Sequence, residues 1–205
     1  MANNQVITIA RGYGSGGKTM GQMLAKELGW AFYDSELLRL ASDESGINEE
    51  LFVKADETAK RSLLFRTATN ALDGEVIPPD RDDFVSNENL FRYQAKIIRM
   101  LADTENCVIV GRAANYILRD RSNVLKVYVH APEKICIRTV MSMYSLTSDE
   151  AQKRISEIDK RRGDYYRHFT GRDWRMADDY DLCIDSSRMD WEKCIHIVRA
   201  YLESM

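Results

Sequence analysis

Short apolar runs alternate along the chain with longer segments in which apolar residues recur at helical spacing. The runs that predict strands are 6–9, 31–33, 107–110, 124–129 and 181–185. The segments with helical spacing are 20–28, 35–40, 48 to about 72, 90–101, 132–141, 148 to about 167 and 190–201. Strands that alternate with helices indicate a parallel sheet with helices on both faces. The pattern therefore predicts an α/β fold of three layers.

An acidic stretch with two adjacent prolines, residues 73–88, interrupts this pattern and predicts an exposed loop. With 205 residues the chain has the length of a single domain. Its 29 Lys and Arg against 32 Asp and Glu give a net charge of −3, which argues against a protein that binds nucleic acid or membranes through a basic surface. No apolar run reaches the roughly 18 residues that a membrane-spanning helix needs.

The four cysteines form no Cys-x-x-Cys motif, and three of them, Cys107, Cys183 and Cys194, stand in apolar stretches. We expect reduced, buried thiols rather than disulfides or metal ligands. The histidines are equally scattered, so no metal cluster is expected. Because the first residues lack the basic start and apolar stretch of a secretory signal, we expect a cytoplasmic protein.

Residues 12–19, Gly-Tyr-Gly-Ser-Gly-Gly-Lys-Thr, match G-x-x-x-x-G-K-[ST] between a predicted strand and a predicted helix. Glycines allow successive backbone N–H groups to turn towards one anion, and the helix start adds its positive dipole end. The Lys18 ammonium would reach the β- and γ-phosphates of a nucleoside triphosphate, ATP above all, and the Thr19 hydroxyl would hold Mg²⁺. The residues expected to bind ATP here are Gly12, Gly14, Ser15, Gly16, Gly17, Lys18 and Thr19.

The phosphate loop alone does not define the reaction. A GTPase would need an Asn-Lys-x-Asp segment, which the sequence lacks, and Asp43-x-x-Gly46 lies in a helical region rather than after a strand. A motor-type ATPase would need an acidic pair at the end of a strand, whereas Asp185 is followed by a serine. Both alternatives are weak, which leaves transfer of a phosphoryl group to a small acceptor.

Such a transferase needs cations around its acceptor. Arg112 follows a predicted strand at the carboxyl edge of the sheet, where open α/β sheets bind ligands. Lys160, Asp164 and Arg167 share one helix face at i, i+4 and i+7, and Arg161 lies close to the same stripe. The spacing alone fits a solvated face with internal salt bridges as well as a functional face.

The sequence resembles the cytidylate-kinase-like branch of the nucleoside monophosphate kinases over nearly its whole length. The segments that carry the resemblance are the phosphate loop, 33–35, 108–112, 126–133, 161–167 and 181–186. It implies a P-loop NTPase fold with a five-stranded parallel sheet in a single kinase domain. It also implies a core of 1–34, 106–145 and 176–205, a helical acceptor-binding insertion at about 35–105 and a lid at about 146–175.

The resemblance further implies roles for individual residues. Arg112 resembles the arginine that grips the acceptor phosphate, whereas Asp164 and Arg167 resemble the lid pair that reaches the acceptor and the transferring phosphate. Arg138 and Arg161 resemble further arginines that face phosphates, Arg138 on the ATP side. The catalytic set is then Lys18, Arg112, Arg161 and Arg167, and the acceptor-binding set is Asp34, Ser35, Arg39, Arg112 and Asp164.

The sequence departs from this family after the second predicted strand. Cytidylate kinases typically follow Asp-Ser with Gly, Ala, Tyr and Arg, whereas here Asp34-Ser35 is followed by Glu36-Leu-Leu-Arg39. Asp34 could hold the acceptor, orient a water on Mg²⁺ or cap its helix.

The combined prediction is an ATP-dependent phosphotransferase that uses Mg²⁺ and a small-molecule acceptor, a pyrimidine nucleoside monophosphate above all, with neither nucleic acid nor membrane as partner. Two alternatives stay open. One is a kinase of a non-nucleotide metabolite, and the other is a non-catalytic nucleotide sensor.

Overall fold

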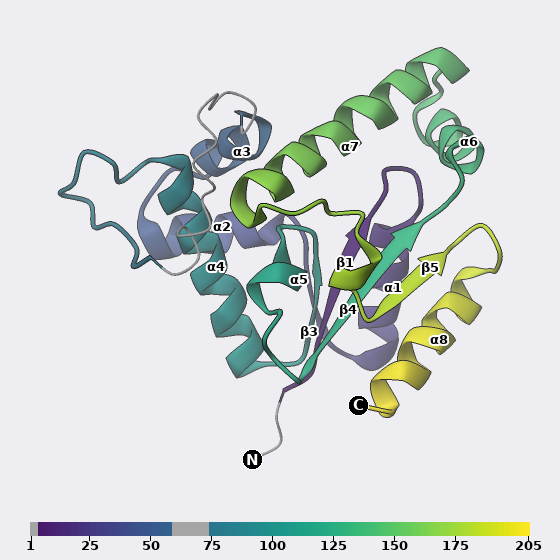
Figure 1. The fold of residues 1–205 in the computed structure, drawn as a ribbon, viewed down its shortest axis with the longest axis horizontal. Coiled ribbons are helices and arrows are strands. Elements are labelled where there is room, and N and C mark those ends of the chain that lie inside the picture. The colour runs from purple at the N-terminus through teal and green to yellow at the C-terminus, as the bar shows by residue number, and fades with distance from the viewer. Residues whose placement is uncertain (1–3, 59–73) are drawn as a thin grey trace.

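Five parallel strands form one sheet in the order β2-β3-β1-β4-β5 (Figure 1) in the computed structural model, which describes residues 4–58 and 74–205. The strands are β1 (Val6–Arg11), β2 (Ala31–Tyr33), β3 (Cys107–Val110), β4 (Val124–His130) and β5 (Leu182–Asp185). β1 occupies the centre and pairs in register with both β3 and β4. The predicted five-stranded parallel sheet is therefore confirmed.

The helices between the strands follow the predicted periodicity. They are α1 (Gly17–Leu28), α2 (Glu36–Ser45), α3 (Glu49–Thr58), α4 (Asn87–Thr104), α5 (Ala114–Ile117), α6 (Glu133–Tyr144), α7 (Ser148–Thr170) and α8 (Trp191–Glu203), with a short 3₁₀ helix, η2 (Ala177–Asp179). A capping box of Thr147 and Glu150 starts α7, and the Asp190 side chain caps α8. Of the helical pattern predicted for 48–72, α3 forms the first part, and residues 59–73 lie outside the described residues.

The two faces of the sheet bury different side chains because successive residues of a strand point to opposite sides. In β1, Ile7 and Ile9 pack with α1 and α8, whereas Val6 packs with α4 and α5. In β3, Val108 packs with α1 and α8, whereas Ile109 packs with α4 and α5. This arrangement gives the predicted three layers.

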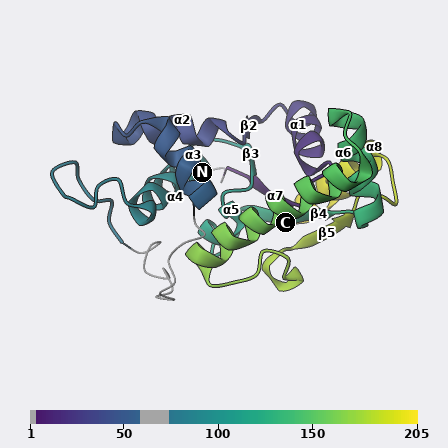
Figure 2. The ribbon, with the colours of Figure 1, turned by 90° about the horizontal axis from the view of Figure 1, so that it is seen from above.

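Helices α2, α3 and α4 stand beside the β2 end of the sheet, and α7 crosses above the carboxyl ends of β1 and β4 (Figures 1 and 2). The described part of the acidic segment, 74–86, is a loop held by Asn89, which is fully buried in α4. The Asn89 side chain accepts from the N–H of Ile77 at 2.7 Å and donates to the carbonyls of Ile77 and Phe84. No helix in the described residues is both long and apolar enough to cross a membrane.

Several element ends differ from the prediction for physical reasons. β1 continues two residues beyond 6–9 because Arg11 pairs in register with Val129 and its side chain forms an ion pair with Asp34. α1 begins at Gly17, so the lysine and threonine of the phosphate loop form its first turn. Cys183, expected to be buried, is exposed because it lies on β5, the edge strand.

Candidate active site

The phosphate loop connects β1 to α1 and is braced from three sides. The Ser15 hydroxyl, 2% exposed, donates to the carbonyls of Gly12 and Val129 at 2.9 and 3.1 Å. From the end of β5, the Ser186 hydroxyl donates to the Ser15 carbonyl at 2.7 Å. Gly16 has φ 79°, and a Cβ there would lie 2.0 Å from the Trp191 ring, so only glycine fits. The loop is a rigid support for backbone N–H groups.

The first turn of α1 suits a phosphate group. It contains Gly17, Lys18 and Thr19, has no acidic residue and is preceded by Gly16 in the left-handed conformation. Its free N–H groups and the positive end of the helix dipole would therefore favour a bound anion. The exposed Thr19 hydroxyl is a hard oxygen donor of the kind that Mg²⁺ prefers. Within the described residues, no group of three or more His, Cys, Asp or Glu could hold a metal ion.

A cavity of about 220 Å³ opens beside the phosphate loop, between α7 and the carboxyl ends of β1 and β3. We call it the arginine cavity because Arg11, Arg112, Arg161 and Arg162 all line it. The other principal lining residues are Asp34, Asn115, Tyr165, Tyr166 and Trp174. Asp34 also lies 2.8 Å from Lys18 through Oδ2 and 3.4 Å from Arg11 through Oδ1. The carboxylate thus connects the phosphate loop to the cavity.

Burial in this cavity disfavours the charged form of its arginines. Burial and the neighbouring Arg162 cation lower the pKa of Arg11 to about 9, and burial also lowers the pKa of Arg112 and of Arg162. Arg11 Nε is buried and finds no acceptor in the described part of the chain. Among the lining residues only Asp34 carries negative charge. An incoming anion would stabilise these guanidinium groups, so the donor set fits a phosphate or carboxylate.

The turn that carries Arg112 is strained. Gly111, Arg112 and Ala113 have φ of 80°, 59° and 53°, a run of left-handed conformations in which only the first residue is glycine. A Cβ at Gly111 would lie 2.2 Å from Arg11 Nη1, so the guanidinium passes directly over the backbone there. The left-handed conformation of this turn places Arg112 beside Arg11 in the lining of the cavity.

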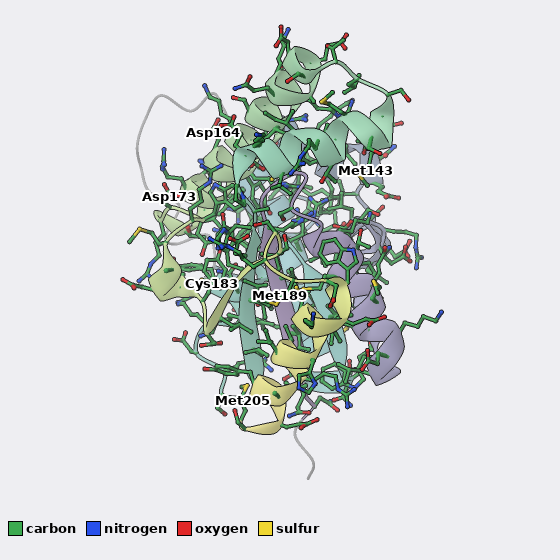
Figure 3. The ribbon with its side chains drawn as sticks, turned by 90° about the vertical axis from the view of Figure 1, so that its right-hand side faces the viewer. Met143, Asp164, Asp173, Cys183, Met189 and Met205 are labelled. Atoms are coloured by element: carbon green, nitrogen blue, oxygen red, sulfur yellow. The ribbon has the colours of Figure 1, made fainter. Side chains whose placement is uncertain are left out.

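A second, larger cavity lies on the other side of α7, near the ends of β4 and β5. This outer cleft has a volume of about 950 Å³, and Lys160, Asp164 and Arg167 all line it. The three residues share a helix face, as their spacing predicts, whereas Arg161 lines the arginine cavity instead. Figure 3 shows Asp164, Asp173 and Cys183 one below the other on this side of the molecule.

Three predicted residues lie away from both cavities. Ser35 is exposed at the cap position of α2, where its side chain makes no cap hydrogen bond. Arg39 is exposed and forms ion pairs with Glu36 and Asp43 along α2. Arg138 is exposed on α6. The structure thus gathers Lys18, Asp34, Arg112 and Arg161 around one space, with Asp164 and Arg167 in the adjoining cleft.

Several polar residues of the site were not predicted, and three of them, Arg11, Asp159 and Arg162, contact one another through hydrogen bonds or ion pairs. Arg162 Nη1 donates to the Arg11 carbonyl at 2.9 Å and lies 3.3 Å from Asp159 Oδ1. A signal existed for Arg11, a charged residue between a buried strand and the glycine motif. No signal separated Arg162 from Arg161, because adjacent residues on a helix differ only in the face that they present.

The comparison of sequences identifies the family. A model of the cytidylate kinase-like family matches residues 6–188. The cytidylate kinase of Methanopyrus kandleri is 24% identical over 209 residues, which cover 98% of this chain and 94% of that protein. The cytidylate kinase of Pyrococcus abyssi is 25% identical, with 98% and 94% covered.

Solved structures agree on the fold. A crystal structure of an uncharacterised protein from Eubacterium ventriosum has a TM-score of 0.71 and 24% identity, covering 98% of this chain and 100% of that one. Shikimate kinase from Bacteroides thetaiotaomicron has a TM-score of 0.54 and 15% identity, covering 97% and 98%. The fold is that of the P-loop kinases. With the family model matched over most of its length, the chain belongs to the cytidylate kinase-like family and is a nucleoside monophosphate kinase-like phosphotransferase.

Proposed function

We propose that the protein transfers the γ-phosphoryl group of ATP to a pyrimidine nucleoside monophosphate, with Mg²⁺ bound at Thr19. The observation that carries the proposal is the contact of Lys18 with Asp34, which joins the phosphate loop to the arginine cavity. A donor phosphate on the loop and an acceptor phosphate in the cavity would be neighbours. Phosphoryl transfer is catalysed mainly by such alignment and by neutralisation of charge.

In this proposal each cluster has its own task. Lys18 and the loop N–H groups hold the β- and γ-phosphates, and Mg²⁺ supplies further neutralisation of their charge. Arg112 and Arg161 bind the acceptor phosphate in the arginine cavity, and Asp34 accepts a hydrogen bond from the acceptor. Arg167 and Asp164 approach from the outer cleft when the lid, about 146–175, closes and excludes water. The insertion, about 35–105, completes the acceptor site.

The test is a panel of acceptors incubated with ATP and Mg²⁺, with formation of ADP and of the phosphorylated acceptor both measured. The panel contains CMP, dCMP, UMP, AMP and a shikimate-type hydroxy acid. The proposal expects the highest kcat/KM with CMP, dCMP or UMP. Turnover of AMP alone would overturn the pyrimidine assignment. ATP binding without transfer to any acceptor would instead support a nucleotide sensor.

A compact non-nucleotide acceptor is the second candidate, and two observations favour it. Arg39, the α2 residue expected to help place a nucleotide, is engaged with Glu36 and Asp43 on the outside of the helix. The arginine cavity also measures only about 220 Å³. Transfer to the hydroxy acid but to no nucleotide would establish this alternative.

A further inference from the structure

The residue at the second position of the phosphate-loop motif, Tyr13, packs its side chain on a hydrophobic cluster formed by α6 and α7. A small hydrophobic cluster joins α6 to the first half of α7 through Cys136, Val140, Ala151 and Ile155. The partly buried residues packed on this cluster come from 131–146, with the exception of Tyr13. In the described part of the chain, the α6–α7 unit therefore takes one residue of the phosphate loop into its own core.

Polar contacts fix the same residue to α7. The Tyr13 N–H donates to Asp159 Oδ1 at 2.9 Å, and Arg154 Nε donates to the Tyr13 hydroxyl at 3.2 Å. The Arg162 guanidinium lies 5.5 Å from the centre of the Tyr13 ring. Arg162 also holds the Arg11 carbonyl. Side chains of helix α7 thus form hydrogen bonds with the backbone on both sides of Gly12.

The position of Asp159 is unfavourable for phosphate binding by itself. This carboxylate is only 8% exposed, and a Cβ on Gly12 would lie 3.8 Å from its Oδ2. A buried negative charge beside a loop that binds anions weakens anion binding unless it is neutralised. Arg162 and Arg175 supply that neutralisation, each at 3.3 Å. Because the Asp159 carboxylate does not favour anion binding, its contact with the Tyr13 N–H points to a role in positioning the helix.

We propose that Tyr13 and Asp159 are positioning residues that dock α7, together with the arginines it carries, onto the phosphate loop. This docking fixes where Arg161 and Arg162 lie in the arginine cavity, and it is present before any nucleotide binds. The inference rests on the proposed binding of ATP at the loop. Neither residue needs to touch the reacting atoms, since both act through the helix.

Hydrogen exchange of the full-length protein without nucleotide tests the docking directly. Tyr13→Ala and Asp159→Asn should each raise exchange of the amides in 155–162 by about tenfold, the value of one charge-assisted hydrogen bond or of a lost ring contact. Tyr13→Phe keeps the ring and should stay within about threefold of the unaltered protein. Glu157→Gln, an exposed acid on the same helix, is the matched control and should leave exchange unchanged.

Binding of the non-hydrolysable analogue AMP-PNP with Mg²⁺ separates positioning from simple damage. Asp159→Asn removes a negative charge near the loop, so affinity should rise by about threefold while protection of α7 falls. A structural lesion would lower both together, and that result, or equal behaviour of Asp159→Asn and Glu157→Gln, would overturn the proposal. If the unaltered protein binds no AMP-PNP, the proposed function fails, and the exchange experiment still decides whether the docking exists.

Discussion

Asp34 connects the phosphate loop to the arginine cavity, because its two carboxylate oxygens contact Lys18 and Arg11. Replacing it with asparagine keeps the size and removes the charge that both cations face. We expect Asp34→Asn to bind an ATP analogue at least as tightly and to lose about 100-fold in kcat, because alignment of the acceptor depends on this side chain. Titration calorimetry and steady-state kinetics measure the two effects.

The control for this change is Asp43→Asn, which removes an exposed partner of Arg39 on α2. Such surface ion pairs contribute little to the free energy of unfolding, so activity and stability should stay close to those of the unaltered protein. An Asp34→Asn variant with unaltered kcat would show that Asp34 serves only to neutralise Lys18.

Asn89 provides a residue-scale prediction about stability rather than catalysis. Three hydrogen bonds from its buried amide hold the loop that contains Ile77 and Phe84. Asn89→Ala leaves those backbone groups without partners, and we expect a loss of about 2–4 kcal/mol in the free energy of unfolding. Urea denaturation measures it. Asn87→Ala, two residues earlier on the same helix, should cost less than about 1 kcal/mol.

At the scale of elements, the turn between β3 and α5 stores strain where it places Arg112. Ala113→Gly relieves a positive φ and should raise stability by about 0.5–1 kcal/mol. Gly111→Ala should do the opposite, lowering stability by more than about 1 kcal/mol, because Gly111 has a φ of 80° and the new Cβ would also displace Arg11 Nη1. Thermal unfolding of the two variants measures whether each change raises or lowers stability. Equal effects of the two changes would contradict the assignment of strain to this turn.

Periodicity predicted the elements because each strand and helix buries a face that is visible in the sequence. It could not predict their ends where tertiary contacts decide them. β1 reaches Arg11 because this residue pairs with Val129 of β4 and forms an ion pair with Asp34, both of them distant in the sequence. Likewise the rotation of α7 decides that Arg161 faces the arginine cavity while Asp164 faces the outer cleft, and local spacing contains no information about that rotation.

At the scale of the whole molecule, the net charge of −3 hides a strong local imbalance. The arginine cavity contains four arginines and one carboxylate, next to a helix terminus and Lys18. Their field attracts anions over the distance of a Debye length. The composition therefore contains no sign of this site, and only the fold reveals how the scattered cations converge on it.

This convergence should make the stability of the entire chain depend on nucleotide. A ligand that binds only the folded protein stabilises it by about 2.7 kcal/mol at 100 times its Kd, which for a domain of this size raises Tm by roughly 5–10 °C. Mg²⁺ with AMP-PNP should produce that shift in differential scanning fluorimetry. Lys18→Ala should abolish both the shift and phosphoryl transfer, because the β- and γ-phosphates lose their cation.

The Tm of Lys18→Ala without ligand should stay within about 2 °C of that of the unaltered protein, since the Lys18 side chain is 54% exposed and its ion pair is worth little. Lys26→Ala, in the last turn of the same helix, should keep the full ligand shift. The comparison isolates the phosphate loop from general effects of charge, because each variant removes one lysine from α1. If Lys18→Ala and Lys26→Ala shift alike, the nucleotide binds away from the loop, and the convergence of cations around it has another purpose.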